Sequence, residues 1–322
     1  MINTIVEQLS VIDPLVFYIA VALISIVILS KAADMLVYGI SNYAKRLGIS
    51  DYLIGFIVVS IATALPELVA SLNGAMLGEG GIVFGTIFGS NLFKIPLLGL
   101  LLIVGKKLKT AENTLGVAPV ITLIIITLPL LLVLDGNLSR IDGIILLCAF
   151  AIYITRLWRK EGILGKMKED VKIKNIYKEG IIFLLALSAL LISGRLLITS
   201  SITISDLLDI PPYFIGLIVI GIGASMPELT VQLRSFATQH HSLAFGNVFG
   251  SLVANSALVL GITALINPFT VDKNLLWIAM IIMVAGITYT LFLMEQEKVT
   301  WKNGVVLMGI YLFFLIAQII FR

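Results

Sequence analysis

Charged residues are scarce in this chain, since Asp, Glu, Lys and Arg make up only 13% of its 322 residues. A soluble globular domain carries roughly a quarter of such residues, so the composition excludes a large soluble protein. Hydrophobic residues make up 59%, and the mean hydropathy is +1.08. These values indicate an integral membrane protein.

Other features are missing as well. The single cysteine, Cys148, excludes a disulfide within the chain and offers no zinc-binding spacing. The net charge of +3 is too small to favour nucleic acid as a partner. The N-terminal stretch MINTIVEQLSVIDP has no Lys or Arg, so we expect no cleaved signal peptide. The apolar segments hold no nucleophile paired with a base, so we expect neither an enzyme nor a cofactor.

Long apolar segments are the main feature that is present. Most of them are long enough to cross the ~30 Å hydrocarbon layer at about 1.5 Å per residue. They lack the alternation of a β-barrel, so we predict an all-α integral membrane protein with ten transmembrane helices. The predicted spans are about 14–38, 50–77, 81–105, 114–134, 141–158, 180–205, 212–238, 243–267, 274–294 and 303–321.

Basic residues are concentrated in alternate connections between these spans. Because Lys and Arg accumulate in cytoplasmic loops, we predict a multi-pass protein of the cell (plasma) membrane with both termini outside. The basic residues that support this orientation include Lys45, Arg46, Lys106, Lys107, Lys109, Arg159, Lys160, Lys166, Lys168, Lys172, Lys174, Lys178, Lys298 and Lys302.

The two halves of the chain resemble each other at a constant offset of 161 residues. Five predicted spans separate the copies, so the second copy should cross the membrane in the opposite sense. We predict two inverted five-helix repeats, 1–158 and 180–322, joined by a basic cytoplasmic linker, 159–179, within one membrane domain. Inverted repeats are typical of secondary transporters with a site at the midplane. Matched pairs include Gly55/Gly216, Pro66/Pro227, Glu67/Glu228, Gly85/Gly246, Gly89/Gly250 and Ser90/Ser251.

Each half places a proline and a glutamate side by side inside an apolar segment, in SIATALPELVAS and GIGASMPELTVQ. Proline removes a helix hydrogen bond and frees a carbonyl, and an acid in the membrane is usually functional. Thr63 stands one turn before Glu67, and Ser225 stands three residues before Glu228. Carboxylates, hydroxyls and carbonyls are ligands for Ca²⁺ and Na⁺. The alternative is a kink with a protonated, hydrogen-bonded glutamate.

The segments that follow also repeat, as GTIFGSNLFK and GNVFGSLVAN. Glycines four residues apart permit close helix packing, which is sufficient reason for them. Ser90 and Ser251 follow these glycines. Each serine either reaches a central ion or donates to a carbonyl of its own helix.

These paired motifs resemble the two α-repeats of the sodium/calcium exchangers in the cation/calcium antiporter superfamily, over both halves of the chain. The resemblance implies a central Ca²⁺ position between two glutamates, flanked by Na⁺ positions, with alternating access through movement of the first and sixth spans. It implies Glu67, Glu228 and Thr63 as the divalent site, while Ala224 could contribute only its carbonyl. The other positions that it implies as ion-lining are Ser60, Gly221, Ser225, Ser90, Ser251, Asn255 and Lys94.

Lys94 departs from the pattern, because this position in the family is neutral and polar, as Asn255 is in the other half. Its ammonium either replaces a transported cation, changes protonation during transport, or pairs elsewhere and braces the bundle. Asp34 and Arg195 also occupy matched positions. Either they form an ion pair between the two mobile spans, or each faces water near a helix end.

Taken together, these features predict an antiporter of inorganic cations in the lipid bilayer. Exchange of Na⁺ for Ca²⁺ is the leading hypothesis. The alternatives are an exchanger that is coupled to protons or has an altered stoichiometry because of Lys94, and a cation channel or leak pathway. The sequence identifies no protein partner and is compatible with a monomer.

Overall fold

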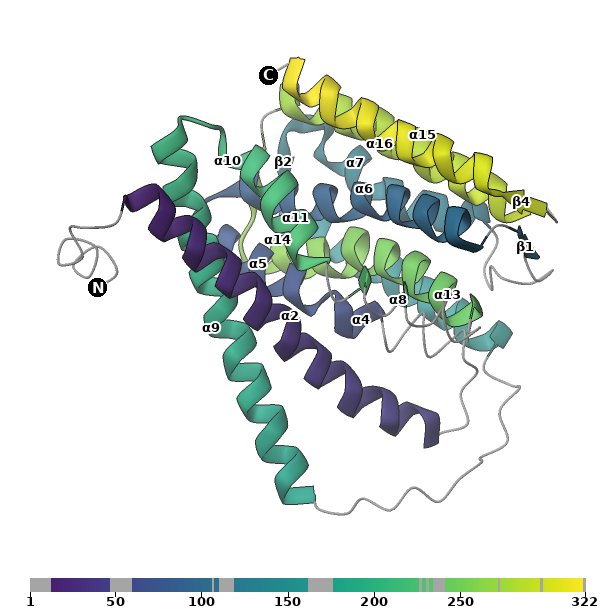
Figure 1. The fold of residues 1–322 in the computed structure, drawn as a ribbon, viewed down its shortest axis with the longest axis horizontal. Helices are drawn as coiled ribbons and strands as arrows, with labels where there is room; N and C mark the ends of the chain where they lie inside the picture. The colour runs from purple at the N-terminus through teal and green to yellow at the C-terminus, as the bar shows by residue number, and fades with distance from the viewer. Residues whose placement is uncertain are drawn as a thin grey trace.

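The computed structural model describes residues 13–46, 60–105, 107–109, 119–161, 176–225, 228–229, 232–233, 241–271, 273–295 and 298–320. These residues are almost all helical, as the apolar segments predicted. Two long helices, α2 (Pro14–Arg46) and α9 (Ile176–Leu208), pack against each other along one side of the molecule (Figure 1). Both extend beyond the predicted spans 14–38 and 180–205.

The predicted break at the first proline is present. Helix α4 (Ser60–Thr63) ends before Ala64, and α5 (Leu65–Met76) begins with Pro66 as its second residue. Proline is tolerated in the first turn of a helix because the N–H groups there have no intrahelical partner. In the second half, α11 (Gly221–Ala224) likewise ends before Ser225, whereas Pro227 lies outside the described residues.

The centre of the molecule is formed by helix α6 and a composite helix in the second half. Helix α6 spans Gly80–Gly105. The composite helix runs through α13 (His241–Val253), the π-helical η4 (Ala254–Val259) and α14 (Leu260–Ile266). α10 (Pro212–Phe214), η3 (Ile215–Ile220) and α11 pack on α6.

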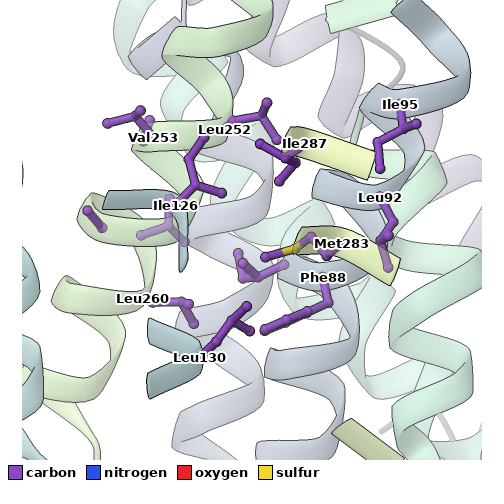
Figure 2. Close-up of a cluster of buried hydrophobic side chains, with 14 of the residues drawn as sticks. Phe88, Leu92, Ile95, Ile126, Leu130, Leu252, Val253, Leu260, Met283 and Ile287 are labelled. Carbon is purple, nitrogen blue, oxygen red and sulfur yellow. The ribbon is translucent and has the colours of Figure 1, made fainter. Parts of the chain in front are cut away.

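The remaining helices cover this centre. They are α7 (Pro119–Leu132), the short η2 (Val133–Asp135), α8 (Arg140–Glu161), α15 (Lys273–Glu295) and α16 (Trp301–Ile320). Figure 1 shows α15 and α16 lying side by side over one face of α6. An apolar cluster fills the space between α6, α7, the composite helix and α15 (Figure 2), and it includes Phe88, Leu92, Ile126, Leu252, Leu260 and Met283.

Two small antiparallel sheets join the halves. β1 (Lys107–Lys109) pairs with β4 (Lys298–Thr300), and β2 (Asn137–Leu138) pairs with β3 (Phe269–Thr270). Helix α6 begins against β3 and ends just before β1, so the two sheets lie at opposite ends of this helix (Figure 1).

Three helices are long and apolar enough to cross a membrane within the described part of the chain: Gly80–Ile103, Gly246–Ile266 and Trp301–Gln318. Shorter apolar helices occur at Pro14–Leu29, Val120–Asp135, Pro212–Ala224 and Met280–Leu293. The number of ten spans therefore stays a prediction. Helices α8 and α9 extend into both ends of the predicted linker 159–179, and its residues 162–175 lie outside the described residues.

Candidate cation site

Two glutamates from matched positions lie at the centre of the molecule. Glu67 is in the first turn of α5, Glu228 is in the short helical segment 228–229, and neither side chain is exposed. The two carboxylates are close enough to interact electrostatically. Among the described residues, Glu67 Oε2 and Glu228 Oε1 have no hydrogen-bond partner. Because buried oxygens without partners are costly, this arrangement favours binding of a positive ligand.

The hydroxyl of Ser90, on α6, connects the two halves. It donates to Glu67 Oε1 over 2.9 Å and lies 2.7 Å from the Ser225 hydroxyl. It also accepts a hydrogen bond of 3.1 Å from Asn255 Nδ2, on η4. Ser225 and Asn255, both from the second half, therefore contact the same hydroxyl group that donates to Glu67.

Lys94 points into this cluster. It lies one turn after Ser90 on α6, and its side chain is fully buried. Its Nζ atom is 3.2 Å from Glu228 Oε2 and donates to Ser90 Oγ over 3.1 Å. Lys94 is therefore paired with a glutamate of the candidate site and not with a distant acid.

Thr63 lies at the end of α4 and is also fully buried. Its hydroxyl donates to the Ser60 carbonyl over 3.2 Å and lies 3.4 Å from Asn247 Oδ1. It also lies close to the Glu228 carboxylate. The Ser60 carbonyl accepts a second hydrogen bond, of 3.0 Å, from the N–H of Ala64. The hydroxyl of Thr63 thus lies within the site, and the Ser60 carbonyl is satisfied within its own helix.

Three other predicted residues are buried nearby. Ser251 donates to the Val248 carbonyl over 3.0 Å. This is a hydrogen bond within its own helix, one of the two alternatives for this serine. Ser251 also lies close to Glu228. The Gly221 carbonyl accepts a 2.8 Å hydrogen bond from the Ser225 hydroxyl. Ala224 ends α11 and brings no polar side-chain atom.

The glycines of α6 explain how the site is assembled. A Cβ atom on Gly89 would lie 2.7 Å from the carbonyl carbon of Leu217, and one on Gly221 would lie 2.9 Å from Gly89 Cα. Contacts this short with backbone cannot be relieved by moving a side chain. The absence of side chains therefore lets α6 lie directly against η3 and α11, which brings Ser90 beside Ser225.

Sequence reasoning missed one buried polar residue that contacts the site, Asn247, and two that follow the glutamates in sequence, Ser71 and Gln232. Asn247 contacts Thr63, and its Nδ2 atom is unpartnered among the described residues. Ser71 and Gln232 stand one turn after the two glutamates, and both are fully buried with unpartnered polar groups in the described structure. The signal was available, because Ser71 and Gln232 are themselves matched at the offset of 161.

The structure leaves the predicted ion pair of Asp34 and Arg195 open. Arg195 is exposed on α9, and the Asp34 side chain lies outside the described residues. In the described part of the chain, no group of three His, Cys, Asp or Glu residues could hold a metal ion. The buried glutamate pair, with its hydroxyls and amides, is the candidate site for a cation because its carboxylates carry unpartnered oxygens.

Comparison with known proteins shows which family this chain resembles. The family described as "Sodium/calcium exchanger protein" matches residues 17–159 and 179–320. A putative antiporter, CaxA, of Alkalimonas amylolytica is 29% identical, with 78% of this chain and 81% of the relative covered. The sodium/calcium exchanger MaX1 of Methanosarcina acetivorans is 28% identical, with 92% of this chain and 97% of the relative covered.

The fold is similar to solved structures of the sodium-calcium exchanger NCX_Mj. One of them, from a crystal soaked with 2.5 mM Na⁺ and 10 mM Sr²⁺, gives a TM-score of 0.69 at 23% identity. The match covers 94% of this chain and 99% of the other. With the family match over both halves and a shared fold, this chain belongs to the sodium/calcium exchanger family, whose members are multi-pass membrane antiporters and not enzymes.

Proposed function

We propose that this protein is a secondary active cation antiporter that works by alternating access, with ions bound between Glu67 and Glu228. The observation that carries the proposal is the pair of fully buried carboxylates, one from each half, with unpartnered oxygens among hydroxyl and amide groups. Two facing carboxylates supply the charge that a divalent ion neutralises. The family and the relative MaX1 support Na⁺ and Ca²⁺ as the exchanged ions. We expect no other cofactor.

The proposed arrangement of the chain is two inverted repeats, 1–158 and 180–322, joined by the linker 159–179. The two small sheets support it. At the offset of 161, β1 corresponds to β3 and β2 corresponds to β4, yet β1 pairs with β4 and β2 with β3. A two-fold axis in the membrane plane would exchange the sheets and place them at opposite membrane faces, as expected for inverted repeats.

The basic connections support a protein of the plasma membrane with its linker in the cytoplasm and both termini outside. Within such a membrane domain the site needs no residue from a second chain, because both carboxylates come from one chain. A monomer would therefore suffice for transport.

A second candidate function is exchange with an altered stoichiometry or with coupling to protons. The observation that favours it is the ion pair between Lys94 and Glu228, which already provides one of the two carboxylates with a positive partner. A channel or leak pathway on the same site would conduct without exchange, so a requirement for a counter-ion separates it from an antiporter.

The test is ion flux in proteoliposomes, with Na⁺ and H⁺ gradients imposed separately and with ²²Na⁺ and ⁴⁵Ca²⁺ as tracers. An antiporter accumulates the tracer only when an exchangeable cation is present on the opposite side. Glu67→Gln should abolish this flux, since it removes one carboxylate and keeps the shape and the hydrogen bond to Ser90. Flux of the Glu67→Gln variant at the wild-type rate would refute the site, and tracer flux without a counter-ion would support the channel.

A further inference from the structure

Lys94 makes the contacts that a bound cation would make. Its ammonium contacts two buried oxygens, Glu228 Oε2 at 3.2 Å and Ser90 Oγ at 3.1 Å. A hydroxyl oxygen has one proton and two lone pairs. The Ser90 proton is donated to Glu67, and Lys94 Nζ and Asn255 Nδ2 donate to the lone pairs. Ser90 therefore has no lone pair left for a metal ion while Lys94 is in place.

Of the two carboxylates, only that of Glu67 has no ion pair among the described residues. In the two glutamates and the described side chains that contact them or Ser90, the oxygens without a hydrogen-bond partner and without the ion pair are Glu67 Oε2, Glu228 Oε1 and Asn255 Oδ1. The formal charge of Glu67, Glu228 and Lys94 together is minus one. Asn255 occupies the position that matches Lys94 in the other half, so the added positive charge belongs to one half only.

We propose that Lys94 is a tethered cation that determines specificity, so that the site carries a single monovalent cation at Glu67 in preference to a divalent ion. This inference rests on the proposed antiport function. The ammonium repels a divalent ion twice as strongly as a monovalent ion at the same distance. A monovalent ion makes the loaded site neutral, whereas a divalent ion leaves a buried positive charge, which is costly inside the membrane.

The experiment compares Na⁺ and Ca²⁺ in wild type and in Lys94→Asn, which places at position 94 the residue found at the matched position in the other half. The matched control is Lys302→Asn, which removes a positive charge from an exposed position on α16. Glu67→Gln is the variant that tests the proposed function itself. Each protein is reconstituted, and ²²Na⁺ exchange against Na⁺ and ⁴⁵Ca²⁺ uptake driven by a Na⁺ gradient are measured over a range of concentrations.

Wild type and Lys302→Asn should exchange ²²Na⁺ against Na⁺. Both should take up ⁴⁵Ca²⁺ only when the Ca²⁺ concentration is high. Lys94→Asn should increase the apparent affinity for Ca²⁺ relative to Na⁺ by on the order of a hundredfold, which corresponds to about 2.8 kcal/mol at 1.4 kcal/mol per tenfold change. Lys94→Asn should also move more charge across the membrane with each transported ion. Glu67→Gln should carry neither ion.

Equal Ca²⁺ affinity in wild type and Lys94→Asn would overturn the role of Lys94 while leaving the antiporter intact. If wild type exchanged neither ion, the proposed function itself would fail. Where Lys94→Asn does not fold, competition in wild type decides the matter: Ca²⁺ should inhibit ²²Na⁺ exchange only weakly. Strong inhibition by Ca²⁺ at concentrations far below those of Na⁺ would overturn the inference.

Discussion

Replacing Glu228 with glutamine should destabilise the protein far more than the same replacement of Glu67. Glu228→Gln leaves the fully buried Lys94 ammonium without its ion-pair partner at 3.2 Å. Removing one partner of a buried ion pair costs about 3–5 kcal/mol. Because the Glu67 carboxylate also interacts with Lys94, we expect a loss near the lower end, about 3 kcal/mol. Glu67→Gln retains the ion pair and an oxygen that accepts from Ser90, so its cost should stay below about 1 kcal/mol.

The assay is equilibrium unfolding of the purified protein in detergent, with Glu67→Gln as the matched control. The double variant Glu228→Gln/Lys94→Met removes both charges, and it should recover most of the stability that Glu228→Gln loses. Equal losses for the two glutamine variants, or no recovery in the double variant, would show that Glu228 does not hold Lys94.

The remaining predictions concern packing, topology and pH. Gly89→Ala should prevent folding or abolish transport, because its Cβ would meet backbone, whereas Gly309→Ala, with nothing within 4 Å, should be tolerated in the same assays. A cysteine introduced at Lys168 should react with an impermeant thiol reagent only after the cytoplasmic face is opened, and labelling from outside would refute the orientation. Burial, and then the nearby Asp206 carboxylate, raise the pKa of Glu79 above its ordinary value. Since an acid with a raised pKa lowers stability as the pH rises, Glu79→Gln should increase the melting temperature at pH 7 and not at pH 4.

Local rules were sufficient for the helical character of the described residues and for the break in the first half. Hydropathy located the helical segments, and Pro66 predicted the interruption between α4 and α5. The ends of α2 and α9 were less predictable, because both continue past the apolar segments into polar residues. Hydropathy alone does not mark where a helix stops outside the membrane.

The composition of the candidate site was predictable, but the partner of its lysine was not. The spacing of Ser90 and Lys94 placed both on one face of a helix, and the 3.1 Å contact agrees with this. Which acid meets Lys94 depends on how α6 packs against the second half, which is set by backbone contacts such as that of Gly89 with Leu217. Such contacts join residues far apart in the chain, and no local pattern specifies them.

The pairing of Lys94 also breaks the symmetry that an inverted repeat would give the site. In an exact repeat the two glutamates would exchange roles when the protein turns from one side of the membrane to the other. Here the Lys94 ammonium lies 3.2 Å from one oxygen of Glu228, while Glu67 Oε2 is unpartnered among the described residues. Because the lysine is covalently attached, it cannot leave with the transported ions, and Glu228 stays neutralised while the pair persists. Under the proposed mechanism, exchange would then be a competition between cations for one carboxylate, that of Glu67.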